Sequence, residues 1–241
     1  MDADDDLGVS LVNLSRLLTG NESLEATLTR VAGYAERAIP GADGVGLTVL
    51  EADRPNTMVA SAPFVRDVDA VQYGLGEGPC ITAVAERRVV RSGSLGGATA
   101  WPRFGPRIGR LGVHSVLSLP LLLPDAVVGA LNVYAHPKDA FDDRATELGQ
   151  LFATPAAASV HNALVLERSR RLVGQLNDAL TNRATIDQAL GIVMSRTGVS
   201  TEEAFDRLRT ISQTEHLKVA EVARRIVVEA VRRAQSRHRD R

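Results

Sequence analysis

Residues 179–227 read ALTNRATIDQALGIVMSRTGVSTEEAFDRLRTISQTEHLKVAEVARRIV. Apolar residues recur in this stretch at the spacing of one helical face, in three successive groups. The groups are Ile186, Ala189, Leu190, Val193 and Met194, then Ala204, Phe205, Leu208 and Ile211, then Val219, Val222, Ala223, Ile226 and Val227. The pattern predicts three short amphipathic helices that share one small core.

The boundary between the first two of these helices carries its own signals. Gly198 can take the left-handed conformation that ends a helix. Ser200, with Glu203 three residues later, forms a capping-box pattern, in which Ser200 accepts a hydrogen bond from the amide of residue 203 and Glu203 reaches back. A helix is therefore expected to end near 197 and the next to begin near 201.

The same stretch resembles the ANTAR domain, a three-helix RNA-binding module of bacterial transcription antiterminators. The matching positions are Arg183, 186–189, Gly191, Met194, Arg196, 203–205, Leu208, Arg209, Lys218, Val222 and Ala223. Leu190 departs from the pattern, since a lysine is common there, and His216 stands where an asparagine often opens the third helix.

The resemblance implies RNA as the partner, and long cationic side chains are what phosphates and unpaired bases require. The candidates for RNA contact are Arg183, Arg196, Arg209, Lys218, Arg224 and Arg225. Each of them taken alone fits a solvated surface charge better than an RNA contact, and the family spacing favours Arg183, Arg196 and Lys218 as contacts.

Charge is distributed unevenly along the chain. Residues 167–241 contain 15 Lys and Arg against 10 Asp and Glu, a net charge of +5, whereas the whole chain carries −1, which leaves −6 for residues 1–166. The basic part would be drawn to polyanions and the acidic part repelled. The end of the chain, RRAQSRHRDR, is a basic tail.

The amino-acid composition limits the class of protein and its cellular location. Of 241 residues, 44% are hydrophobic and 24% charged, as in a soluble globular protein. Cys80 is the single cysteine, which excludes an internal disulfide and a multi-cysteine metal site, and no metal is expected. The acidic start MDADDDLGVS is unlike a signal peptide, and no apolar run reaches the roughly 18 residues of a membrane span. We therefore expect a cytoplasmic protein with no membrane partner.

The first 165 residues are expected to form an α+β domain, with an antiparallel sheet and helices packed on one side of it. Helices are predicted at 7–19, 23–39, 81–86 and 104–111 and from 142 onward; strands are predicted at 44–52, 57–63, 87–93, 114–123 and 126–135; residues 53–56 are read as a hairpin connection.

This order resembles the GAF domain, a small-molecule-sensing and dimerising fold. The residues that carry the resemblance are 42–50, the LGEGPC segment at 75–80, 115–121, 129–134 and the helix from Phe141. It implies a ligand of unknown identity between the sheet and the loops over it, framed by Tyr73, Cys80, Trp101, Phe104, Val116 and Asn132.

Two of these residues have a structural alternative. Cys80 is either a redox or ligand-attachment thiol, with its thiolate stabilised at a helix N-terminus, or a small core residue. Trp101 is either a packing anchor or a platform for a ligand. No cofactor is evident from the sequence.

Residues 159–186 are predicted to form one uninterrupted helix that joins the two parts. Val165, Leu172, Ala179 and Ile186 stand seven residues apart, with Leu166, Val173 and Leu180 beside them. Such seams favour a coiled-coil homodimer, in which Val165, Leu172, Leu176 and Ala179 would lie in the interface. The alternative is that the stripe packs back on its own domains. The expected organisation is a sensor at 1–165, a helical coiled-coil linker at 166–178 and an RNA-binding domain at 179–241.

No catalytic motif is present, so we do not expect an enzyme. The two resemblances together imply a signal-responsive RNA-binding regulator that acts by transcription antitermination, through hairpins in leader transcripts. The alternatives are a DNA-binding transcription regulator and a protein-interaction module in signalling. The acidic start of the second helix, Ser200-Thr201-Glu202-Glu203, counts against the DNA reading, because phosphates would lie there.

Overall fold

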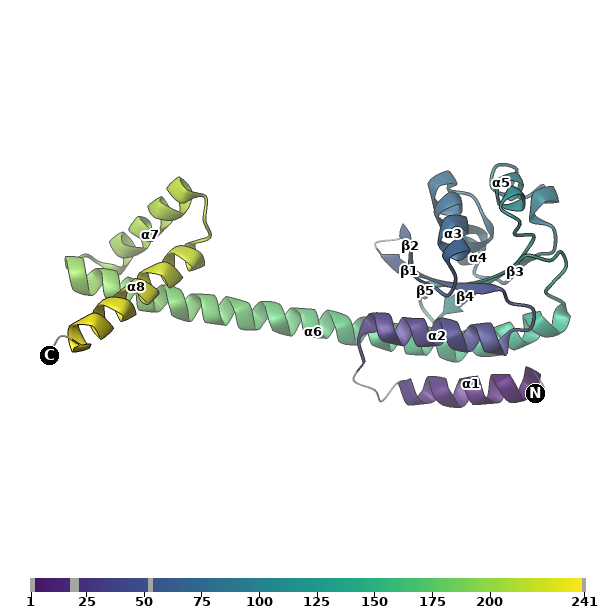
Figure 1. Cartoon of the computed structure of the whole chain (residues 1–241), viewed down its shortest axis with the longest axis horizontal. Helices are drawn as coiled ribbons and strands as arrows, with labels where there is room; N and C mark the ends of the chain where they lie inside the picture. The colour runs from purple at the N-terminus through teal and green to yellow at the C-terminus, as the bar shows by residue number, and fades with distance from the viewer. Residues whose placement is uncertain (1–2, 18–21, 52–53, 240–241) are drawn as a thin grey trace. The chain divides into compact units, whose positions relative to one another are not determined.

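The structure is a computed structural model that describes residues 3–17, 22–51 and 54–239. The chain divides into two compact units, Met1–Glu167 and Arg168–Arg241, which are described separately below. Elements carry the labels of Figure 1.

A five-stranded antiparallel sheet organises the first unit, with the strand order β2-β1-β5-β4-β3. The strands are β1 (Gly44–Glu51), β2 (Arg54–Ala60), β3 (Val90–Ser92), β4 (Ser115–Leu122) and β5 (Val127–Ala135). The predicted α+β class and the antiparallel sheet are confirmed. Asp53 of the predicted hairpin connection lies outside the described residues, and Arg54–Asn56 belong to β2.

Helices cover both faces of this sheet (Figure 1), so the prediction of helices on one side is wrong. On one face lie α1 (Ala3–Leu17), α2 (Leu24–Ala38) and the beginning of α6 (Asp143–Thr197); on the other lie α3 (Pro63–Leu75), α4 (Pro79–Glu86) and α5 (Gly105–Arg110). The reason lies in β4 and β5, whose residues are buried on both faces. Leu117 contributes to the α1-α2-α6 side, and its neighbour Val116 to the α3-α5 side.

The helix α3 was not predicted, although it carries its own signals. Pro63 occupies its first turn, where a missing N–H costs nothing, and Val65 and Val68 are fully buried three residues apart. Gly76, with a φ of 64°, ends it. A short 3-10 helix, η1 (Leu95–Gly97), precedes α5.

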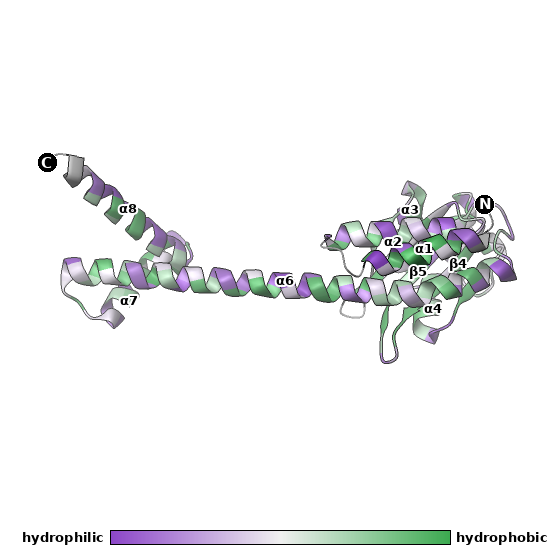
Figure 2. Ribbon diagram, turned by 90° about the horizontal axis from the view of Figure 1, so that it is seen from below, coloured by the Kyte–Doolittle hydropathy of each residue, from purple (hydrophilic) through white to green (hydrophobic). Residues whose placement is uncertain are grey.

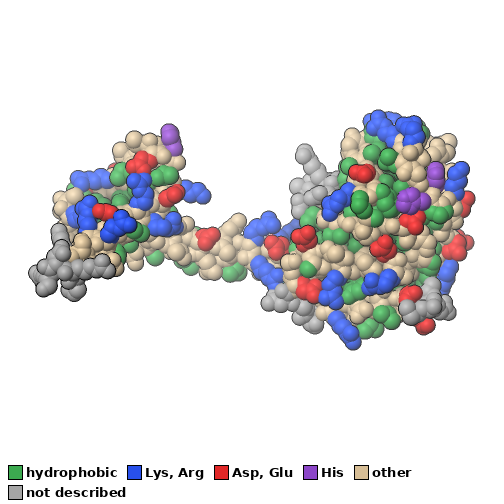
Figure 3. Space-filling view, in the orientation of Figure 1, with side chains coloured by type: hydrophobic (Ala, Val, Ile, Leu, Met, Phe, Trp, Pro, Cys, Tyr) green, Lys and Arg blue, Asp and Glu red, His purple; other side chains and the backbone are tan. Residues whose placement is uncertain are grey.

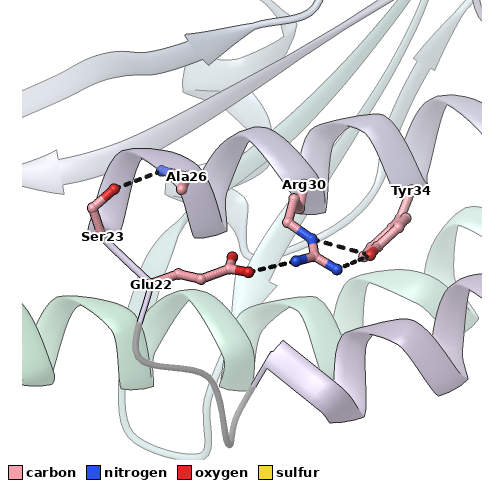
Figure 4. A network of polar contacts seen from close by, with 5 residues as sticks. All are labelled: Glu22, Ser23, Ala26, Arg30 and Tyr34. Carbon is pink, nitrogen blue, oxygen red and sulfur yellow. Dashed lines mark hydrogen bonds and ion pairs between the residues drawn. The ribbon is translucent and has the colours of Figure 1, made fainter.

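The start of α2 is fixed by polar contacts (Figure 4). The Ser23 hydroxyl accepts a hydrogen bond of 3.2 Å from the Ala26 amide and so caps the helix. Arg30 pairs with Glu22 at 2.5 Å and donates to the Tyr34 hydroxyl at 2.9 Å. The Arg30 side chain is exposed, whereas Tyr34 belongs to the buried core together with apolar residues such as Leu28. The predicted helices at 7–19 and 23–39 correspond to α1 and α2, with residues 18 and 19 outside the described part.

The second unit contains the end of α6, α7 (Thr201–Glu215) and α8 (Val219–Arg239), as predicted. Its core consists of Ala189, Leu190, Ala204, Leu208, Val222 and Ala223. Two of the predicted features at this boundary are confirmed: Gly198 has a φ of 70°, and the Glu203 amide donates to the Ser200 hydroxyl at 3.2 Å; the return contact of the Glu203 side chain stays a prediction. Phe205 and Ile211 were assigned to the core, but they are 40% and 38% exposed. Ala204 and Leu208, four residues apart, make the buried stripe of α7 without them.

The helix α6 runs without a break from Asp143 to Thr197 and so includes the predicted continuous helix at 159–186. Asp142 caps its start, since the Ala145 amide donates to its carboxylate at 2.7 Å. Within the described ranges, no helix combines the length and apolar character needed to cross a membrane.

Candidate functional site

Eight polar side chains gather in the first unit between the sheet and the helices α3 and α4. We call them the polar cluster: Thr48, Asp69, Gln72, Tyr73, Cys80, Ser118, Asn132 and Tyr134. All are buried except Tyr73, which is half-buried. Because polar groups are costly to bury without partners, the arrangement depends on the hydrogen bonds between them.

Gln72 joins α3 to α4 and to the sheet. Its Nε2 donates to Asp69 Oδ1 at 3.1 Å, and its Oε1 accepts from the Cys80 amide at 3.0 Å. The Tyr134 hydroxyl, on β5, donates to the same Asp69 oxygen at 2.6 Å. Glycine is required at position 78, because a Cβ there would stand 2.4 Å from Gln72 Oε1 and the backbone has a φ of 156°.

A second chain of hydrogen bonds crosses the three central strands and ends at α3. The Ser118 hydroxyl donates to Asn132 Oδ1 at 3.0 Å, and Asn132 Nδ2 donates to Thr48 Oγ1 at 3.2 Å. Thr48 Oγ1 lies 2.5 Å from the Tyr73 hydroxyl, which lies 3.8 Å from Cys80 Sγ. The two chains therefore meet around Cys80.

The environment of Cys80 favours the reading of a small core residue over that of a stabilised thiolate. Burial, followed by the charge of Asp69, raises the pKa of the Cys80 thiol to about 11, although hydrogen bonds with Asn132, Tyr73 and Thr48 oppose the shift. Cys80 does lie in the first turn of α4, but its side chain is fully buried, and desolvation outweighs the helix terminus. The thiol is held neutral.

The six predicted ligand-pocket residues divide between two neighbouring groups. Tyr73, Cys80 and Asn132 belong to the polar cluster, whereas Trp101, Phe104 and Val116 belong to an apolar cluster under α3, α4 and α5. Trp101 is 7% exposed, and its Nε1 donates to Thr82 Oγ1 at 3.1 Å. Side chains from both groups occupy the interior where the ligand was expected, and a small-molecule site there stays a prediction.

Sequence reasoning missed five members of the polar cluster: Thr48, Asp69, Gln72, Ser118 and Tyr134. Two of these positions carried a signal. Thr48 and Ser118, like the predicted Asn132, are polar residues in the middle of strands that are otherwise apolar. Asp69 and Gln72 were missed with the helix that carries them.

The LGEGPC loop is tied to the segment before α5. Glu77 Oε1 accepts hydrogen bonds from the backbone amides of Arg103 at 2.8 Å and Phe104 at 3.0 Å. The Phe104 hydrogen bond is the main cause of a lowered pKa of the Glu77 carboxyl. Within the described residues, no group of three His, Cys, Asp or Glu side chains is arranged to hold a metal ion.

In the second unit all six candidate RNA contacts are exposed. Arg183 and Arg196 lie on α6, Arg209 on α7, Lys218 just before α8, and Arg224 and Arg225 on α8. On the face shown in Figure 3, basic side chains gather over α7 and α8 with acidic and hydrophobic side chains among them.

The structure brings three of the six together around one groove of about 660 Å³. Arg196, Arg224 and Arg225 line it, whereas Arg183, Arg209 and Lys218 lie outside it. Arg209 pairs with Asp206 at 2.9 Å.

The predicted dimer residues lie on an exposed stripe of α6. Val165 is 48% exposed, Leu172 and Leu176 are each 56% exposed, and every residue from 171 to 181 is exposed. Figure 2 shows hydrophobic residues recurring along this helix. An apolar stripe in this state is the feature of a helix that can pair with another.

Two family models match the chain, that of the GAF domain over residues 21–161 and that of the ANTAR domain over residues 174–227. Among curated proteins, an anaerobic nitric oxide reductase transcription regulator NorR from Vibrio vulnificus is 27% identical over 107 residues. That match covers 44% of this chain but only 20% of the regulator, so the chain spans about a fifth of the relative's length.

Solved structures show the same fold for the first unit. A GAF domain from a phosphoenolpyruvate-protein phosphotransferase of Coxiella burnetii aligns with a TM-score of 0.54 and 17% identity, over 68% of this chain and 98% of that one. A reduced form of fRMsr from Staphylococcus aureus aligns with a TM-score of 0.50 and 17% identity, over 64% and 94%. At these identities the likeness concerns the fold alone. Because the GAF model covers more than half of the residues, the chain belongs to the GAF family, and it carries an ANTAR domain after its GAF domain.

Proposed function

We propose that this protein is a signal-responsive, RNA-binding regulator of transcription, with a sensor at 1–165, a helical linker at 166–178 and an RNA-binding head at 179–241. The pairing of a GAF with an ANTAR domain supports a sensory regulator with an RNA-binding output. We further propose that the regulator acts by antitermination: a dimer captures hairpins in a leader transcript and so keeps a terminator stem from forming.

The observation that carries this proposal is a set of cations without internal partners. Arg183, Arg196 and Lys218 are exposed, and none of them forms an ion pair with another residue in the part of the chain that the structure describes. Their charges are thus available to phosphates. Hairpin loops suit such a surface, because their unpaired bases expose edges that A-form helices hide.

The DNA-binding alternative is disfavoured by the start of α7. Glu202 and Glu203 occupy its first turn, and the Ser200 hydroxyl already accepts from the Glu203 amide. A phosphate at this helix end would meet two carboxylates instead of an open N-terminus.

The exposed stripe of α6 supports a homodimer through the linker helix. Leu172 and Leu176 lie within the stretch 171–181, where no side chain is buried. Burying a leucine side chain fully contributes roughly 1.5–3 kcal/mol, so a pair of helices that covered these residues would gain several times that. We place Val165, Leu172, Leu176 and Ala179 in this interface.

We propose no enzymatic reaction for the GAF domain. The buried, neutral state of its single cysteine supports this part of the proposal. It also assigns no ligand to the sensor. A cytoplasmic location follows from the proposed partner, since leader transcripts are made there.

Binding measurements test the proposal. The full-length protein should bind RNA hairpins more tightly than duplex DNA at equal salt, with an affinity that falls as salt rises. The double variant Arg183→Glu, Lys218→Glu should bind hairpin RNA at least ~10-fold more weakly, with an unchanged circular dichroism spectrum. Salt-dependent binding to duplex DNA, with none to hairpin RNA, would refute the proposed function.

The dimer has a separate test. Aspartate at both Leu172 and Leu176 should convert the dimer to a monomer in sedimentation velocity, because charges in a coiled-coil seam are not tolerated. A matched pair, Arg171→Asp and Gln175→Asp, changes neighbouring exposed positions outside the seam and should leave the dimer intact. A dimer that persists in the leucine variant would place the interface elsewhere.

A further inference from the structure

The groove in the ANTAR domain combines apolar and charged walls. Its apolar lining comes from α7 and α8 and consists of Ile211, Val222, Ile226 and Val228. Ile211 is 38% and Val228 56% exposed, so apolar surface is accessible inside the groove. A volume of about 660 Å³ is within the range of roughly 300–1,000 Å³ typical of small-ligand sites.

Three arginines and three glutamates line the groove, but their charges are not equally available. Glu215 is paired with Arg225 inside the groove, and Glu229 with Arg233, at 2.7 Å, outside it. Two of the three carboxylates are therefore neutralised. Glu221 lies in the first turn of α8, where the helix N-terminus offsets a negative charge.

Among the residues that the structure describes, the two remaining arginines have no carboxylate partner. Arg224 donates to a neutral acceptor, Asn182 Oδ1, at 3.4 Å, and neither Arg224 nor Arg196 forms an ion pair within that part of the chain. The groove thus presents two uncompensated guanidinium groups beside an apolar floor.

We propose that this groove binds one unpaired nucleotide of an RNA hairpin loop, with the base on the apolar floor and Arg196 and Arg224 on its flanking phosphates. The inference rests on the proposed function and adds the site itself, including residues outside the family-derived candidates. Apolar side chains pack on base faces, and guanidinium groups neutralise phosphates or stack on bases. A polyanion without bases would leave Ile211 and Val228 uncovered, and an apolar peptide would leave the two arginines without an anionic partner.

The test separates base contacts from phosphate contacts by using two probes with the full-length protein. One probe is a pool of RNA hairpins with random loop sequences, and the other is the same pool with abasic loops, which keep the phosphates. The wild type should bind the first pool ~10-fold more tightly, since the contact between a base and the apolar floor is lost with the abasic loops.

A matched pair of variants on α7 tests the floor. Ile211→Ser should lose most of the preference for intact loops, whereas Phe205→Ser, at nearly the same exposure but outside the groove lining, should keep it. Because both side chains are partly exposed, both variants should keep the fold, and circular dichroism checks this.

A second pair tests the arginines. Arg196→Gln with Arg224→Gln should weaken binding to both pools and lower the slope of log K against log salt by about 1.4, as for two single-strand phosphates. Arg207→Gln with Arg232→Gln removes equal charge outside the groove lining and should have a smaller effect.

Three results would overturn the inference. The first is equal wild-type affinity for intact and abasic loops. The second is an Ile211→Ser variant that binds RNA normally, and a change in its sedimentation would then mark the groove as a protein interface. The third is a wild type that binds neither pool, which defeats the proposed function as well. If the wild type binds RNA hairpins and the groove variants bind them equally well, only this inference is refuted, and the proposed function stands.

Discussion

The reactivity of Cys80 distinguishes a sensing thiol from a structural one. Only the thiolate reacts with disulfide reagents and alkylating agents. The pKa of the Cys80 thiol is about 11, against an ordinary value of 9.0, a difference of two units. At pH 8 the thiolate fraction in the folded protein is therefore lower by about 100-fold than in an unfolded chain, and full burial of the side chain slows the reaction further.

The assay is direct, because the chain contains a single cysteine. The rate of reaction with 5,5′-dithiobis(2-nitrobenzoic acid) is measured at pH 8 for the native protein and for the protein in denaturant. We expect the native rate to be at least ~100-fold lower. A native rate within ~10-fold of the unfolded rate, or a rate that titrates with a midpoint below 9, would refute the assignment of Cys80 to the buried core.

The same shift has a consequence for stability. The folded state favours the neutral thiol, so its contribution is fully present below the unfolded pKa of about 9 and is lost as the pH rises towards 11. A shift of this size corresponds to a loss of about 3 kcal/mol. A Cys80→Ala variant should lack this alkaline decline in urea denaturation midpoints, although its stability at pH 7 is lower because a buried side chain is truncated.

Three further predictions concern single contacts. Tyr134→Phe removes the hydroxyl that donates to Asp69 at 2.6 Å and should lower the free energy of unfolding by about 1.5–3 kcal/mol in urea melts, whereas an unchanged midpoint would mean that the cluster is dispensable. Ser200→Ala removes the α7 cap and should cost about 1 kcal/mol, with Ser195→Ala as a control on the exposed surface of α6. The Asp43 carboxyl has a lowered pKa, chiefly because the His136 amide donates a hydrogen bond to it. The ionised carboxylate therefore stabilises the fold above its ordinary pKa of 3.8, and this contribution is lost as the pH falls through the lower pKa of the folded state. Asp43→Asn should flatten the decline of the melting temperature at acid pH.

Local signals in the sequence were sufficient for the second unit. Gly198 and Ser200 act within one or two turns of chain, and both adopt the predicted geometry. The helical periods of residues 186–227 likewise depend on neighbours three and four positions away. Exposure is different, because it depends on how many helices are available to cover a face. In a unit of three helices, Ala204 and Leu208 suffice for packing, and Phe205 and Ile211 remain at the surface.

Non-local pairing limited the prediction for the first unit. An alternating pattern would have indicated a sheet with one covered face, but β4 and β5 are nearly continuous apolar runs, which indicate two covered faces. With α3 missed, the second face lacked its longest helix, and the predicted helices at 81–86 and 104–111, which correspond to α4 and α5, were placed on the same side as the others. Asp69 and Gln72 of the polar cluster were missed for the same reason, since they reach it only when α3 lies over the sheet.

The polar cluster also constrains how the sensor can respond to a signal. Gln72 connects α3 to Cys80 on α4 and to Asp69, and Tyr134 connects this pair to β5. A molecule that entered between the helices and the sheet would break several of these bonds, and each buried group left without a partner costs about 1–3 kcal/mol. An apolar ligand would leave that cost uncompensated. A ligand with its own donors and acceptors could replace the bonds of Gln72, and the displacement of α3 and α4 would then follow from binding itself. If a small molecule binds at this position, the cluster therefore favours a polar one over an apolar one.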